Sequence, residues 1–205
     1  MAKKKTARKA KDATTKQNAA AKQKRGRASF AQKITNARRR ARADVRLNAV
    51  KAFAAIAEKG NALDVTVFTA RLKDSDWRVR QAALFGLPDI VAQPNVEVVR
   101  AVTDCLKKDL QPDVRQAAAL ALIRTVEKGH PEAFEALNTR SLEDESLYVR
   151  RDAAEAAALI VDKNKVEAGR LIRERLEFLN KAVRTIRERN EFLKAWNALP
   201  RFLNS

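Results

Sequence analysis

The chain has 205 residues, enough for one domain with a substantial core but short for two. Aromatic residues make up 5% of it, and five glycines and five prolines are few, so the composition favours helices over a sheet-rich fold. A single cysteine excludes an internal disulfide, and no apolar run approaches the roughly 20 residues of a membrane span. We therefore expect an all-α intracellular protein of the cytoplasm, nucleoid or nucleus.

The net charge of +18 is concentrated at the ends of the chain. Residues 1–50 hold 17 lysines and arginines against two acids, a net charge of +15, whereas residues 51–162 have a net charge of −3. Residues 163–205 have a net charge of +6. A near-neutral body with a strongly basic N-terminal region predicts a polyanionic partner, usually nucleic acid, with an anionic membrane surface or simple solubility as alternatives.

Residues 1–28 form a predicted basic arm without aromatic or β-branched aliphatic side chains. This arm buries too little apolar surface to offset chain entropy, so we expect it to be disordered when free. Its flexible cations would neutralise phosphates without reading bases. The arm residues assigned to phosphate binding are Lys3, Lys4, Lys5, Arg8, Lys9, Lys11, Lys22, Lys24, Arg25 and Arg27.

An arginine cluster follows the arm, on a predicted amphipathic helix from about Phe30 to Arg42. Its guanidinium groups can hold phosphates in a more defined geometry than lysines do, and we predict contact with DNA or RNA. A targeting signal, such as "KRGR" at residues 24–27 or "RRRAR" at residues 38–42, is the alternative role of this region. The cluster consists of Arg38, Arg39, Arg40 and Arg42.

The dipeptide Val-Arg recurs four times, with spacings of 34, 35 and 35 residues. Small or apolar residues stand mostly 4, 7, 8 and 11 positions after each valine, which places them on one face of a helix. We therefore predict four similar helices whose small side chains let a neighbouring helix approach closely. The four copies are Val45-Arg46, Val79-Arg80, Val114-Arg115 and Val149-Arg150.

Shorter amphipathic segments alternate with these helices and follow the breakers "KGN", "QPN" and "KGH". They are Leu63–Leu72, Val96–Leu106 and Pro131–Leu142, and the segment from Phe30 to Arg42 would pair with the first Val-Arg helix. Residues 29–162 are thus predicted to form four to five stacked helix pairs. We expect this helical body to dock a protein partner.

An aspartate stands six residues before three of the four arginines: Asp74 before Arg80, Asp109 before Arg115 and Asp144 before Arg150. The first copy has Arg40 in place of the acid. Together with the repeat period, this pattern resembles the HEAT-repeat family, including its short-repeat branch of phycobilin lyase-like proteins. The resemblance implies an α-solenoid in which these acids and arginines form a ladder between successive turns.

Residues 163–205 depart from the repeat, because Arg187 replaces the small residue four positions after Val183. We favour a pair of helices, broken near Asn180-Lys181, that cap the solenoid. The alternative is one long helix with a dimer seam in which Asn190 sets the register. The apolar row that supports both interpretations is Ile172, Leu176, Leu179, Val183, Ile186 and Leu193.

The chain offers few groups for catalysis, and we expect no enzyme activity, metal or cofactor. His130 precedes a predicted helix, where a turn or helix-start role is expected, and Cys105 falls on an apolar face as a small hydrophobe. One histidine and one cysteine cannot form the usual protein zinc site, and no glycine-rich phosphate loop is present.

Our main hypothesis is a non-catalytic, nucleic-acid-associated scaffold or adaptor. The family resemblance supplies one enzymatic alternative, a HEAT-like DNA glycosylase or other repair enzyme, because such glycosylases use Trp, Asp and Arg on a concave face. Residues of these types here are Asp76, Trp77, Arg115 and Trp196, but Asp76 and Trp77 fall in a predicted turn, Arg115 belongs to the ladder, and both tryptophans stand at ordinary packing positions. A third alternative is a protein-only scaffold with a basic targeting signal.

Overall fold

The computed structural model describes residues 35–92 and 94–198, with side chains described up to residue 191. The chain divides into two compact units, Met1–Arg46 and Leu47–Ser205. The described residues are mainly helical and include no β-strand, which confirms the predicted all-α class. A helix over residues 35–54 precedes α2 (Ala62–Arg71), α3 (Trp77–Ile90), α4 (Val96–Lys108), α5 (Pro112–Thr125), α6 (Pro131–Glu143), α7 (Leu147–Ile160) and α8 (Val166–Ala198).

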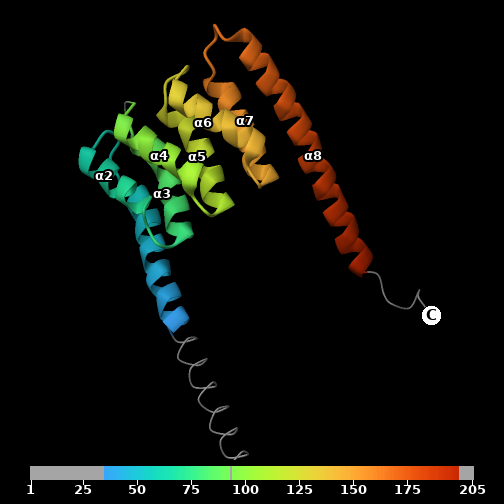
Figure 1. The fold of residues 1–205 in the computed structure, drawn as a ribbon. Coiled ribbons are helices and arrows are strands. Elements are labelled where there is room, and N and C mark those ends of the chain that lie inside the picture. The colour runs from blue at the N-terminus through green and yellow to red at the C-terminus, as the bar shows by residue number, and fades with distance from the viewer. Residues whose placement is uncertain (1–34, 93, 199–205) are drawn as a thin grey trace, which may run out of the picture. The chain divides into compact units, whose positions relative to one another are not determined.

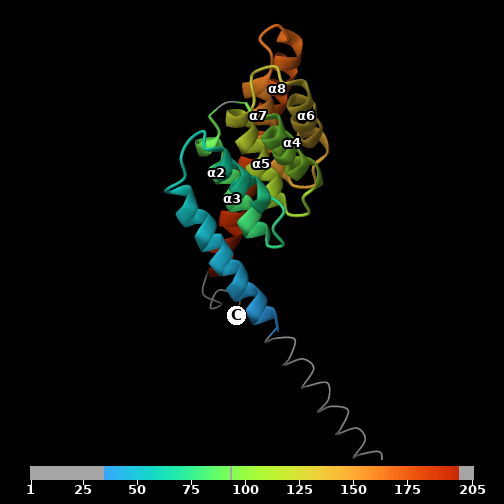
Figure 2. The ribbon, with the colours of Figure 1, turned by 90° about the vertical axis from the view of Figure 1, so that its left-hand side faces the viewer.

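Helices α2 to α7 form three consecutive pairs that stack in two layers (Figures 1 and 2). In one layer α3 packs on α5 and α5 on α7, and in the other α4 packs on α6. Each pair is closed by contacts within it, between α2 and α3, α4 and α5, and α6 and α7. This arrangement is the predicted α-solenoid.

Side chains just before the helices explain where several of them begin. The Asn61 carboxamide oxygen accepts the N–H of Leu63 at 2.9 Å, and that of Asn95 accepts the N–H of Glu97 at 3.0 Å. His130 Nδ1 accepts the N–H of Ala133 at 3.3 Å, so the predicted helix-start role of this histidine is confirmed. These contacts satisfy N–H groups that have no partner within a first helical turn.

Two of the loops between layers require glycine. Gly60 and Gly129 both have a φ of 85°, a left-handed conformation that other residues rarely adopt. The N–H of Gly60 donates to the carbonyl of Ile90 at 2.7 Å, and that of Gly129 donates to Ile160 at 2.7 Å. Each glycine therefore ties the loop before a helix pair to the last turn of the second helix of that pair, α3 for Gly60 and α7 for Gly129.

The predicted small-residue face is confirmed in the second, third and fourth Val-Arg copies. Val79, Val114 and Val149 are fully buried, and so are the alanines four positions later. The residues 7, 8 and 11 positions after each valine are also buried. The shared burial explains why α3, α5 and α7 stack so similarly: small side chains at these positions let helices approach closely.

The first copy has a different register, and the prediction for it is wrong. Residues 35–54 form one helix with no break between Arg42 and Val45: no glycine or proline interrupts this segment, and Asp44 lies inside the helix. Ile56, placed in the buried face by the repeat, is 75% exposed, whereas Val50 is buried. Phe53 stacks on Phe68 of α2 with ring centroids 5.6 Å apart. Larger side chains therefore replace the small face at this point.

Helix α8 also differs from the favoured prediction. It runs without interruption from Val166 to Ala198, so the expected break at Asn180-Lys181 is absent. No glycine or proline stands near that point to stop the helix. Ile172, Leu179 and Val183 of its apolar row are buried, and α8 packs on α7. One long helix thus covers the end of the stack (Figure 1).

Substitution of Gly86 tests the close packing of α2 on α3. A Cβ atom at Gly86 would overlap Cε1 of the buried Phe68, so Gly86→Ala should lower the free energy of unfolding by about 1–3 kcal/mol despite the better helix propensity of alanine. Urea denaturation followed by circular dichroism measures this change.

Gly169→Ala is the matched control. A Cβ atom there comes closest to the flexible end of Arg173, 3.3 Å away, and meets Val161 at an ordinary contact distance of 3.7 Å, so the higher helix propensity of alanine should leave the stability unchanged or raise it by up to about 1 kcal/mol. Equal effects of the two substitutions would contradict the packing argument.

Candidate nucleic-acid interface

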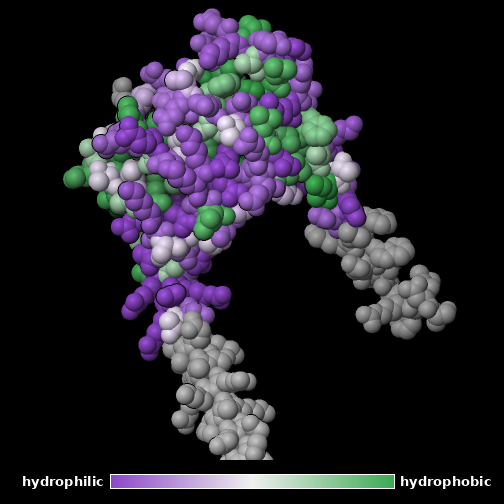
Figure 3. Space-filling model, in the orientation of Figure 1, coloured by the Kyte–Doolittle hydropathy of each residue, from purple (hydrophilic) through white to green (hydrophobic). Residues whose placement is uncertain are grey.

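The predicted phosphate-binding residues fall in two groups with different outcomes. The ten arm residues, from Lys3 to Arg27, lie outside the described residues. The four cluster residues, Arg38, Arg39, Arg40 and Arg42, lie on the described helix, and all are exposed. Figure 3 shows hydrophilic side chains spreading from this helix.

Helical geometry distributes the four guanidinium groups around the helix. Arg38 and Arg42 are one turn apart and share a side, whereas Arg39 and Arg40 point to successive other sides. No ion pair within the described residues involves any of the four. The cluster therefore presents unpaired positive charge in several directions. Such an arrangement suits an extended polyanion better than a single small anion.

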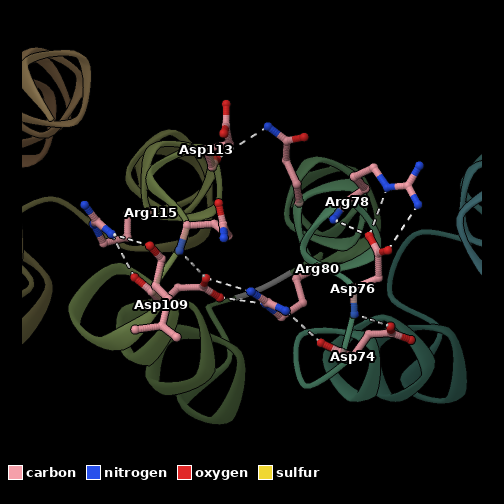
Figure 4. Close-up of polar contacts among 10 residues, drawn as sticks. Asp74, Asp76, Arg78, Arg80, Asp109, Asp113 and Arg115 are labelled. Atoms are coloured by element: carbon pink, nitrogen blue, oxygen red, sulfur yellow. Dashed lines mark hydrogen bonds and ion pairs between the residues drawn. The ribbon is translucent and has the colours of Figure 1, made fainter. Parts of the chain in front are cut away.

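The arginines of the repeat are used differently. Arg80 donates from Nε and Nη2 to the two carboxylate oxygens of Asp109, at 2.6 and 2.7 Å, and from Nη1 to the backbone carbonyl of Asp74 at 2.8 Å (Figure 4). One guanidinium thus bonds a carboxylate of the next turn and a carbonyl of its own turn. Such a planar fork is the geometry that arginine offers and lysine does not.

Arg115 repeats this arrangement one turn further along. It donates to both carboxylate oxygens of Asp144 at 2.7 Å and to the carbonyl of Asp109 at 2.9 Å. Arg115 is 8% exposed and Asp144 is 1% exposed, so this pair is buried. The predicted ladder between successive turns is confirmed by these two rungs.

The structure also specifies what the six-residue spacing means. Within one turn the arginine binds the backbone carbonyl of the aspartate, and Arg150 likewise donates to the carbonyl of Asp144 at 2.8 Å. The carboxylates of Asp74, Asp109 and Asp144 each accept the N–H two residues later, at 2.9 Å, and so shape their own turn. The ion pair itself joins an arginine to the aspartate 29 residues later. The six-residue motif does not by itself indicate this pairing.

Two of the residues considered for an enzyme site, Asp76 and Arg115, take part in other contacts. Asp76 caps α3, and hydrogen bonds from Arg78 hold the pKa of its carboxyl below the usual value. Arg115 belongs to the ladder, and the Trp196 side chain lies outside the described residues. Cys105 is buried as predicted, and burial raises the pKa of its thiol to about 11. No group of three or more metal-binding side chains occurs in the described part of the chain.

One surface feature was missed by the sequence reasoning. A groove of about 610 Å³ lies between residues 47–54 and α3, lined by Leu47, Trp77 and Phe85 with Lys51 and Asp89 at its polar positions. Phe85 is largely exposed although it stands between buried helix positions. Phe85 stands six residues after Val79, outside the positions of the repeated buried face, and this place in the sequence could have predicted its exposure.

Comparison with known proteins agrees with this geometry. The family model for HEAT repeats matches residues 31–122 and 65–158, which together span more than half of the chain. The chain belongs to the HEAT-repeat family. No curated protein matches it.

The HEAT-repeat body is a helical-repeat scaffold, a class that commonly mediates protein interactions. Within the described residues no helix is long and apolar enough to cross a membrane. The compartment predicted from composition stays a prediction.

The electrostatics of the HEAT ladder follow from its burial. Hydrogen bonds from the guanidinium groups to Asp109 and Asp144 raise the pKa values of Arg80 and Arg115 above their ordinary value. Burial by itself raises the pKa of the Asp144 carboxyl, but the bonds from Arg115 and the Ser146 N–H outweigh it, and the pKa is lowered. Both partners of the buried rung therefore stay charged at neutral pH.

The buried rung should matter far more than an exposed pair of the same length. Asp144→Ala leaves Arg115 buried without its counter-charge and should lower the free energy of unfolding by about 3–5 kcal/mol. The control is Asp89→Ala, which removes the 2.7 Å pair with Arg124; both side chains are more than half exposed, so the loss should stay below about 1 kcal/mol. Similar losses in urea denaturation would contradict a ladder that holds the repeats together.

The pH dependence of stability provides an independent check on the same residue. Because the pKa of Asp144 is lower in the folded chain than in the unfolded chain, its contribution is present at neutral pH. It is lost as the pH falls through about 4 towards the folded pKa. Between pH 6 and 3 the unfolding free energy of the wild type should therefore fall more steeply than that of Asp144→Asn.

Proposed function

We propose that this HEAT-repeat protein is a non-catalytic, nucleic-acid-associated scaffold. In this proposal the arginine cluster and the basic arm contact phosphates of DNA or RNA, and the helical body docks a protein partner. The observation that carries it is the contrast between two sets of arginines. Arg80 and Arg115 are neutralised within the ladder, whereas the four cluster arginines are exposed and unpaired among the described residues.

The distribution of charge supports a polyanion as the partner of the N-terminal region. Residues 1–50 carry +15 while residues 51–162 carry −3, so the body itself does not attract nucleic acid electrostatically. Helical arginines grip phosphates with defined direction, and flexible lysines add counterion release that does not depend on sequence. Binding of this kind should be strong at low salt and should discriminate little between sequences.

The enzymatic alternative has little support, because the three described residues considered for it serve other contacts. Asp76 caps α3, Trp77 lines a groove at the start of that helix, and Arg115 is buried in the ladder. A protein-only scaffold with a basic targeting signal is the stronger rival. This rival is favoured if the association with protein partners in an extract does not decrease at all after nuclease treatment.

Neutralising the arginine cluster tests the proposal. The quadruple variant Arg38→Gln, Arg39→Gln, Arg40→Gln and Arg42→Gln should bind labelled duplex DNA and single-stranded RNA more weakly in fluorescence anisotropy. If all four contact phosphates, the slope of log affinity against log salt for duplex DNA should decrease by about 3–4.

The matched control removes the same number of exposed positive charges from the body, at Lys59, Lys73, Arg100 and Lys128. This variant should keep at least most of the wild-type salt slope. Equal losses in both variants would mean that only net charge matters, and an unchanged slope in the cluster variant would contradict the proposed interface. A deletion that tests the arm should end before residue 35, because the helix over residues 35–54 continues into Val50 and Phe53, which pack on the core.

A further inference from the structure

Helix α8 uses only one of its sides to cover the HEAT stack. Ile172, Leu179 and Val183 are buried on that side, where α8 packs on α7. Arg175 donates to the side chains of Asn138 and Ser141 on α6, at 2.8 and 2.6 Å. These contacts determine which side of α8 faces the stack and leave another side outward.

The outward side carries apolar residues that nothing in the described chain covers. Leu171 is 49% exposed, Phe178 is 72% exposed and Ile186 is 41% exposed. At about 100° per residue Leu171 and Phe178 lie within about 20° of each other around the helix, whereas Ile186 follows the buried Leu179 by seven residues and continues the row that packs on α7. Leu171 and Phe178 therefore form a short apolar row of their own, distinct from the row that packs on α7.

A row of six exposed charges runs beside this apolar row, on the side away from α7. Successive members are four, three, four, three and four residues apart, so they follow one line along the helix. Their signs in chain order are plus, minus, minus, plus, plus, minus. The six are Arg170, Glu174, Glu177, Lys181, Arg184 and Glu188.

This row is complementary to itself when it is reversed. Residues 170 and 188, 174 and 184, and 177 and 181 are each equally spaced about residue 179, and each pair has opposite charges. In an antiparallel helix pair, equivalent flanks face each other, so a second α8 would place an opposite charge against each of the six.

Phe178 lies close to the same centre. With two α8 helices crossed antiparallel near residues 178 and 179, Phe178 of each copy lies beside the two-fold axis. The most exposed apolar residue of this side of α8 therefore lies at the centre that the charged row specifies. Arg170 now bonds Glu167 and Glu174 within α8, but these pairs are exposed and can exchange at little cost.

We propose that two copies of this chain associate through the outward side of α8, as an antiparallel two-fold pair centred near Leu179. The pairing uses a different face from the seam that the sequence indicated, because that seam packs on α7. It goes beyond the proposed function and can be measured without nucleic acid. An assembly of this kind would present two arginine clusters to one polyanion.

Charge reversal tests the self-complementary row by sedimentation equilibrium. The wild type should dimerise with increasing concentration, whereas Glu174→Arg with Glu177→Lys and, separately, Lys181→Glu with Arg184→Glu should each weaken self-association at least tenfold. An equimolar mixture of the two variants should restore a dimer, because every altered charge then faces its opposite. Glu97→Lys with Glu127→Lys, the same charge change on exposed sites of the body, should dimerise like the wild type.

Disulfide trapping tests the direction of the pair. Phe178→Cys should form a covalent dimer on mild oxidation, while Leu171→Cys should not, because its equivalent in the other copy would be far away. Cys105 does not interfere, since it is buried and its thiol has a pKa of about 11. The proposal is overturned if the wild type stays monomeric, if the mixture fails to restore a dimer, or if Leu171→Cys is trapped as readily as Phe178→Cys.

Discussion

The bidentate pair between an arginine of one turn and an aspartate of the next is the contact on which the rest of this structure depends. Asp109 shows why, because it acts in three ways at once: its carboxylate binds Arg80 and caps its own turn, and its carbonyl binds Arg115. A change at any of these groups disturbs two adjacent repeats. Buried pairs of this kind contribute geometry more than net stability, since desolvation offsets much of their attraction. In this chain that geometry sets the stacking of α3 on α5 and of α5 on α7.

The ladder also explains where the repeat ends. Residue 179, which stands 29 positions after Arg150, is a leucine buried on α7, so within the described residues Arg150 binds only the carbonyl of its own turn. The chain forms no further turn at that point and continues as the uninterrupted helix α8. A helix that ends a stack needs one apolar side to cover the core, and its other sides are not required for the fold. The outward side of α8, with its exposed Phe178 and its antisymmetric charges, is such a surplus face.

The buried cations of the helical body and the exposed arginine cluster have different roles. The cations of the body serve structure wherever they are buried, because a buried charge requires a partner. The arginine cluster has no such constraint: its side chains are exposed, and unpaired charge in water is cheap to maintain and available to phosphates. The proposed phosphate contacts and the proposed pairing of α8 therefore occupy surfaces that the solenoid does not use. Each can change without loss of the fold.

Local patterns in the sequence determined the helical class, the register of the last three Val-Arg helices and the helix-start role of His130, because periodicity and caps act over a few residues. The ladder residues followed from the family resemblance that their spacing carries. Only the tertiary structure decided that each arginine pairs with the aspartate of the next turn, that Val50 rather than Ile56 faces the core, and which side of α8 points outward. These outcomes depend on how whole helices stack, and stacking is set by contacts between residues far apart in the chain.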